Sequence, residues 1–133
     1  MRVDTIREYC LAKPGVTEGF PFTEATLVFK VMGKMFLLAG IDNIPLSINI
    51  KSDPEKAMEL REKYEEVQPG YHMNKKMWNT VILNGRIPSK EVLAWIDESY
   101  ALVVQSLPKT VREELERGTV AVKADVSRER RKK

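Results

Sequence analysis

Residues 26–40 place two short β-rich runs on either side of a glycine-containing turn. The first run is TLVFKV, the second is KMFLLAG, and Met32-Gly33 lies between them. Two such runs joined by two residues predict a β-hairpin. The next run, residues 45–51, alternates apolar and polar side chains, which predicts a third strand with one face in water. The hairpin therefore favours an antiparallel sheet over parallel β-α-β crossovers.

Helices are predicted before, between and after the strands. We expect the first to run from Asp4, its N-cap, to about Ala12, where Lys-Pro-Gly ends it. A second begins after Asp53, a predicted N-cap followed by proline, and turns its charges outward. Ser89 is the predicted cap of the longest helix, whose apolar stripe contributes most of the helical core. A short final helix is expected to end at Gly118.

The segments between these helices complete the predicted architecture. Residues 14–25 form an irregular link, and residues 78–83 form a further strand that Asn84-Gly85 ends in a turn. The order α-β-β-β-α-β-α predicts an α+β fold, an antiparallel sheet with helices packed on one face. Phe20 and Phe22 in the link are expected to cover the core, with an exposed aromatic groove as the alternative.

The charge of the chain is concentrated at its C-terminus. The net charge is +3, and the last six residues, RERRKK, contribute +4, so the remaining 127 residues sum to −1. Length and this charge step predict one domain over residues 1–118 and a mobile basic extension over residues 119–133. The extension is expected to be solvated, with a nucleic-acid-binding or acidic-surface-binding arm as the alternative.

The cysteine and histidine content limits the catalytic and metal-binding chemistry that the sequence predicts. The chain has one cysteine, Cys10, and no apolar run of 18 residues, which predicts a cytoplasmic protein without a membrane segment. Cys10 is expected to be a buried apolar side chain. We expect no metal and no cofactor, since a single histidine, His72, offers no ligand cluster. Enzyme activity is disfavoured, although His72 alone could act as a general base.

The segment QPGYHMNKKMWNT, residues 68–80, gathers the most polar and aromatic candidates. Its lysines can neutralise phosphates, its asparagines can hydrogen-bond to bases or backbone, and its aromatic side chains can stack. The candidate nucleic-acid-binding residues are His72, Asn74, Lys75, Lys76, Trp78 and Asn79, extended by Arg86 on the next turn. The competing interpretation is structural, with Trp78 packed on the sheet and Asn74 forming an Asx-turn.

The chain resembles the MmcQ/YjbR family over about residues 4–117. The resemblance rests chiefly on YHMNKKMWNTVIL followed within about 20 residues by SYALVV, and also on REYCLAKPGV and KSDPEKAMELREKY. It implies a CyaY-like, frataxin-like fold and the double-wing DNA-binding role proposed for the family. This chain departs from many members at Met77, where they have a histidine. It also lacks the acidic ridge of iron-binding frataxins, since its first helix offers only Asp4 and Glu8.

These features together predict a non-catalytic DNA-binding domain. The 71–79 segment and the 84–86 turn are expected to contact DNA as two projecting wings. The alternative is a protein-interaction or small-ligand-binding module without nucleic acid. DNA and another protein are therefore the two expected partners, and the sequence predicts no oligomeric state.

Overall fold

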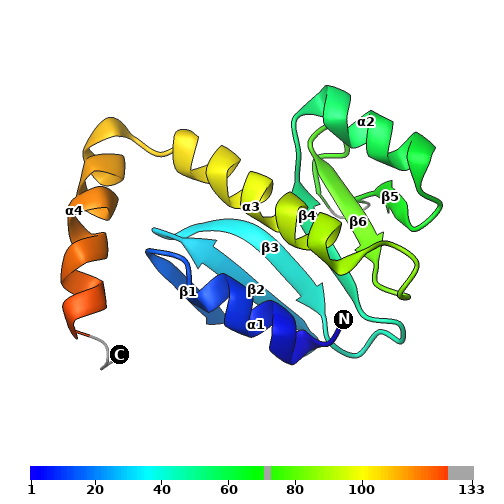
Figure 1. The fold of residues 1–133 in the computed structure, drawn as a ribbon, viewed down its shortest axis with the longest axis horizontal. Helices are drawn as coiled ribbons and strands as arrows, with labels where there is room; N and C mark the ends of the chain where they lie inside the picture. The colour runs from blue at the N-terminus through cyan, green and yellow to red at the C-terminus, as the bar shows by residue number, and fades with distance from the viewer. Residues whose placement is uncertain (71–72, 126–133) are drawn as a thin grey trace.

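The computed structural model describes residues 1–70 and 73–125, with side chains described as far as residue 117. The elements follow in the order α1 (Val3–Leu11), β1 (Val16–Gly19), β2 (Thr26–Val31), β3 (Lys34–Gly40), β4 (Ser47–Lys51), α2 (Pro54–Lys63), β5 (Val67–Pro69), β6 (Trp78–Ile82), α3 (Ser89–Gln105) and α4 (Lys109–Asp125). Figure 1 shows one twisted sheet, with α1 and α3 lying across it and α4 at one side. None of the described helices has the length and apolar character to cross a membrane.

The six strands form a single antiparallel sheet in the order β1-β2-β3-β4-β6-β5. The predicted hairpin is confirmed, because β2 and β3 pair across Met32 and Gly33, which both adopt positive φ angles of 48° and 87°. Positive φ at both central residues gives a turn whose twist matches that of the strands. Strand β6 inserts between β4 and β5, so residues distant in the sequence become neighbours.

One face of the sheet carries the main core. The register places Phe29, Leu37 and Ile50 side by side across β2, β3 and β4, and all three are fully buried. Helices α1 and α3 pack on this face through Ile6, Cys10 and Ile96, among others. The predicted class, α+β with an antiparallel sheet and helices packed on it, is confirmed. The likeness to frataxin stays a prediction.

Two strands were not predicted. Strand β1 lies inside the expected link, and β5 follows α2, where no strand was expected. Both are short edge strands that pair with β2 and β6 respectively. Glu18 of β1 also accepts two hydrogen bonds from Arg7 of α1, at 2.8 and 2.5 Å. Such short strands depend on partners that are distant in sequence, which local patterns do not show.

The helix ends confirm one predicted cap and correct the others. Asp53 caps α2 as expected, because its side chain accepts from the backbone N–H groups of residues 55 and 56. Asp4 lies instead in the first turn of α1, after the N-cap Arg2, and Ser89 is the first residue of α3 rather than its cap. Helix α4 continues past Gly118 to Asp125. The separate extension over residues 119–133 stays a prediction, and the RERRKK run lies outside the described residues.

Ser99 joins α3 to two strands where their pairing ends. The β3–β4 ladder extends to Leu37 and Ile50, one residue short of Phe36 and Lys51. The fully buried Ser99 hydroxyl donates to the Phe36 carbonyl at 2.6 Å and accepts from the Lys51 N–H at 2.9 Å. A single oxygen therefore satisfies a buried acceptor and a neighbouring donor that the ladder leaves unpaired.

Candidate nucleic-acid interface

Arg61 of α2 anchors the segment before β6. Its Nε donates to the side-chain oxygen of Asn79 at 2.6 Å, and its Nη2 donates to the backbone oxygens of Lys75 and of Trp78, the latter at 3.3 Å. The prediction that all charges of α2 turn outward was therefore wrong. Arg61 follows Ala57 by four residues, and side chains at this spacing share a helix face. Because Ala57 is buried, this spacing was a usable signal.

Asn79 and Trp78 are placed for packing. Asn79 has no solvent exposure, and its amide nitrogen donates to the Ala57 carbonyl at 3.2 Å. Its predicted contact with nucleic acid is corrected, because both ends of the amide are occupied inside the protein. Trp78 is 8% exposed and packs with Val28 and Leu38 on the sheet face opposite the main core. The structural interpretation of Trp78 as a packing residue therefore agrees with its burial.

Asn74 shapes the turn that carries two adjacent lysines, Lys75 and Lys76. We call these two residues the lysine pair and the turn the lysine turn. The Asn74 side-chain oxygen accepts from the Lys76 N–H at 2.9 Å, which is the predicted Asx-turn. Its carbonyl accepts from the N–H groups of Met77 and Trp78, at 3.1 and 2.9 Å. Lys75 and Lys76 are exposed on this turn. His72, also predicted to contact nucleic acid, lies outside the described residues.

Arg86 lies at the opposite end of β6 from the lysine pair. The predicted Asn84-Gly85 turn is present, with Gly85 at φ 91° and the Arg86 N–H donating to the Asn84 side chain at 3.1 Å. The Arg86 guanidinium lies 3.8 Å from the buried carboxylate of Glu66. Arg86 therefore faces an acidic partner and does not extend the surface of Lys75 and Lys76.

The sheet brings other lysines to the pair. Lys51 at the end of β4 lies opposite Trp78, the first residue of β6, and Lys30 lies opposite Met35 in the β2–β3 ladder. Lys34 begins β3 beside the hairpin turn. We call the end of the sheet formed by these side chains the lysine surface, and its members are Lys30, Lys34, Lys51, Lys75 and Lys76. The first three were not predicted as site residues, because their neighbours depend on the order of the strands in the sheet.

Sulfur-containing and aromatic side chains lie next to the lysine surface. Val28, Leu38 and Trp78 form a small buried cluster on the face that carries Lys30 and Lys51. The partly buried Met35, Met73 and Met77 pack against this cluster. The cluster connects the segment before β6 with β2 and β3, so the lysines from the two regions belong to one side of the molecule.

Four of the five side chains of the lysine surface have no close carboxylate in the described part of the chain. Among the described side chains, no carboxylate lies within 4 Å of the ammonium groups of Lys30, Lys34, Lys51 or Lys76. Other basic side chains do have such partners, as Lys13 does with Asp97 and Lys56 with Glu98. A domain whose first 127 residues sum to −1 therefore still presents a local concentration of positive charge.

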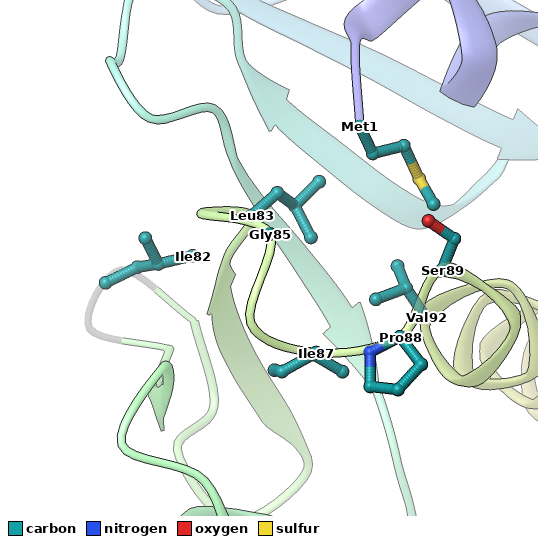
Figure 2. Close-up of a pocket in the computed structure, with 8 residues that line it drawn as sticks. All are labelled: Met1, Ile82, Leu83, Gly85, Ile87, Pro88, Ser89 and Val92. Atoms are coloured by element: carbon teal, nitrogen blue, oxygen red, sulfur yellow. The ribbon is translucent and has the colours of Figure 1, made fainter.

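The cavity near the start of α3 lacks the positive charge of the lysine surface. Figure 2 shows it between Met1, Leu83, Ile87, Val92 and the Ser89 hydroxyl, and its volume is about 100 Å³. No charged side chain lines it. Ligand pockets usually hold about 300–1,000 Å³, so this cavity is too small for a nucleotide or a comparable substrate.

Cys10 is a buried thiol that belongs to no metal-binding cluster in the described structure. Cys10 is fully buried, as predicted, and burial raises the pKa of its thiol to about 12. A thiol with such a pKa is protonated at neutral pH and is a poor nucleophile. Within residues 1–70 and 73–117, no three histidine, cysteine, aspartate or glutamate side chains are grouped so as to hold a metal ion.

Comparison with known protein families shows which family this chain belongs to. The family model described as YjbR matches residues 11–102. The chain belongs to the YjbR family. This confirms the resemblance, whose segments extend on both sides of the matched region.

Relatives in this family cover nearly the same length. The Escherichia coli K12 protein named "Uncharacterized protein YjbR" is 32% identical over 113 residues, which are 84% of this chain and 95% of that protein. The E. coli O157:H7 protein named YbdF is 37% identical over 80% of this chain and 87% of its own. These YjbR-family names state no activity.

Solved structures show the same fold. The crystal structure of Deinococcus radiodurans protein DR2400, described by the domain DUF419, matches with a TM-score of 0.82 and 40% identity, over 86% of this chain and 88% of that one. A Pseudomonas syringae crystal structure matches with a TM-score of 0.66 and 29% identity, over 77% of this chain and 98% of that one. This chain therefore shares its overall fold with these two proteins.

Proposed function

We propose that this YjbR-family domain binds DNA, without catalysis, through the lysine surface. The observation that carries the proposal is that Lys30, Lys34 and Lys51 come from three strands to the side of the sheet against which the segment with Lys75 and Lys76 packs. The ammonium groups of Lys30, Lys34, Lys51 and Lys76 have no close carboxylate among the described side chains and so attract phosphates. Each contact with a phosphate releases counterions from the DNA. A surface of this kind holds DNA without reading its sequence.

The proposed contact differs from the two wings expected from the sequence. The lysine turn remains one of the two expected contacts with DNA. The β2–β3 hairpin, which carries Lys34, replaces the 84–86 turn as the other contact. Arg86 has no role in the proposal, because it faces Glu66 at the other end of β6. Asn79 and Trp78 support the surface from within. The predicted role of His72 stays a prediction.

Fluorescence anisotropy of a labelled 20-base-pair duplex across a salt series tests this function. The variant Lys30→Ala/Lys34→Ala/Lys51→Ala should bind more weakly than the unaltered chain. Its slope of log affinity against log salt should be shallower by about 2.7 if each lysine contacts one phosphate, at about 0.9 for each contact. The slope reports the number of contacts and not only their strength.

A matched control removes equal charge elsewhere. The variant Lys90→Ala/Lys109→Ala/Arg112→Ala loses the same three positive charges from exposed helical positions and should keep the original slope. A chain ending at Ser127 measures what RERRKK contributes. If the two triple variants bind alike, or if removal of RERRKK alone abolishes binding, the lysine surface is not a DNA-binding site.

A protein-interaction or small-ligand module is the second candidate. Phe20 and Phe22 are 50% and 63% exposed, so the prediction that they cover the core was wrong. Exposed aromatic side chains of this size are typical of binding surfaces. Equal duplex binding by the two triple variants would favour this candidate.

We also propose a cytoplasmic location, which rests on the single, unpaired Cys10.

A further inference from the structure

A groove of about 470 Å³ lies along the lysine surface. Its walls include Phe22 from the link after β1, Lys30 and Met35 from the β2–β3 ladder, Lys34 beside the hairpin turn, and Lys51 at the end of β4. The end of α3 closes it through Val103 and Ser106. The volume lies within the usual range for sites that hold a small ligand.

Phe22 gives this groove a flat apolar surface. Its side chain is 63% exposed and belongs to neither of the buried apolar clusters. An exposed phenylalanine contributes little to folding, because most of its apolar area stays in water. Met35 adds a second apolar wall, and the ammonium groups of Lys30, Lys34 and Lys51 supply positive charge. Aromatic and cationic groups in one groove match a nucleobase joined to phosphate.

We propose that this groove binds an unpaired base of single-stranded DNA. The base stacks on the ring of Phe22, and the neighbouring phosphates contact Lys30, Lys34 and Lys51. This inference rests on the proposed function and narrows it. Bases in a duplex are stacked on one another, so only an unpaired base presents a face to Phe22. The duplex can still bind through its phosphates, but without this contact.

Phe20 provides a matched control for Phe22. It lies two residues earlier, is 50% exposed, and lines two other hollows with Arg7, Glu18 and Val28. One of these hollows shares Lys30 with the groove, but the Phe20 ring does not line the groove itself. Substitutions of either exposed ring should leave the fold intact, since surface changes of this kind have small effects on stability. A difference between Phe22 and Phe20 variants therefore reports the position of the ring and not the loss of an aromatic residue.

The test is fluorescence anisotropy of the full chain with a labelled oligothymidine of about 12 nucleotides, within the range of known single-strand sites, and with the duplex at the same salt. Phe22→Ala should weaken binding of the single strand by at least about fivefold, the lower end for loss of one stacked base. It should leave duplex binding unchanged. Phe22→Leu, which keeps an apolar side chain, should also bind the single strand more weakly, and Phe20→Ala should bind both ligands normally.

Three results would overturn this inference. The first is equal weakening of single-strand and duplex binding by Phe22→Ala, and the second is no weakening of either. The third is competition by thymidine 5′-monophosphate at the concentration at which unlabelled oligothymidine competes, which would assign the groove to a free nucleotide. The proposed function is judged separately by the lysine triple variant on the duplex. It fails if that variant keeps the original salt slope, whatever Phe22→Ala does.

Discussion

The guanidinium of Arg61 donates a 2.6 Å hydrogen bond to the side-chain oxygen of Asn79, a residue without solvent exposure. The same guanidinium donates to the carbonyls of Lys75 and Trp78. One side chain of α2 thus holds both the start of β6 and the turn that carries the lysine pair.

Loss of Arg61 should destabilise the domain. In Arg61→Ala the buried Asn79 oxygen loses its donor, and an unsatisfied buried polar group costs about 1–3 kcal/mol. We expect the free energy of unfolding, measured with urea, to fall by about 2 kcal/mol. Arg112→Ala, at an exposed position on α4, is the control and should change little. Equal stability of the two variants would show that the Arg61 bonds are not formed in solution.

Ser99→Ala should also be destabilising. The change removes the oxygen that pairs the Phe36 carbonyl and the Lys51 N–H, so two backbone groups lose their partner. At about 1–3 kcal/mol for each buried unsatisfied group, we expect a loss of about 3 kcal/mol. Urea unfolding of Ser99→Ala and of the exposed control Ser89→Ala measures the difference. A loss no larger than that of the control would argue against the bridge.

Alkaline pH should weaken the fold through acidic groups that keep their protons in the folded state. Burial raises the pKa of Cys10 to about 12, and burial is also the main cause that raises the pKa of Tyr9 and Tyr100. Between the ordinary and the raised pKa values, the unfolded chain has lost protons that the folded chain retains. Stability is therefore complete below about pH 8.5 and falls as pH rises toward 12.

The variant Cys10→Ala isolates the thiol in this pH dependence. It should lose less stability than the unaltered chain between about pH 8 and pH 10.5, because it lacks the group that ionises only when unfolded. Urea midpoints of both proteins at the two pH values measure this. Parallel losses in the two proteins would mean that the Cys10 thiol has no raised pKa.

Gly70 should not tolerate a side chain. A Cβ at this position would lie 3.1 Å from both the Cβ and the carbonyl oxygen of Trp78, whose oxygen also accepts from the Gly70 N–H at 2.9 Å. Overpacking of this kind costs about 1–3 kcal/mol, which we expect for Gly70→Ala in thermal or urea unfolding. Gly19→Ala is the control, since no atom lies within 4 Å of its added Cβ. A stable Gly70→Ala protein would contradict this packing.

The elements that the sequence predicted best are those whose signals are local. Met32-Gly33 marks its turn by itself, and Asp53 with its following proline marks the start of α2. Strands β1 and β5 have no comparable signal, because each is formed by pairing with a strand distant in sequence.

The same contrast between local signals and long-range pairing applies to the candidate site. The Asx-turn at Asn74 is local and was predictable, as was the exposure of Lys75 and Lys76 on it. The addition of Lys51 required knowing that β4 pairs with β6, which is a property of the whole sheet. The burial of Asn79 likewise depends on α2 packing over β6, which brings Ala57 and Arg61 to it.

The anchoring of the lysine turn by Arg61 also has a thermodynamic consequence for any ligand. Ordering a free loop costs conformational entropy. A loop that becomes ordered only on binding therefore weakens the affinity and raises the dissociation constant. Here the carbonyls of Lys75 and Trp78 are already held when the domain folds. The turn is thus pre-organised, so its backbone adds little conformational entropy to the cost of association.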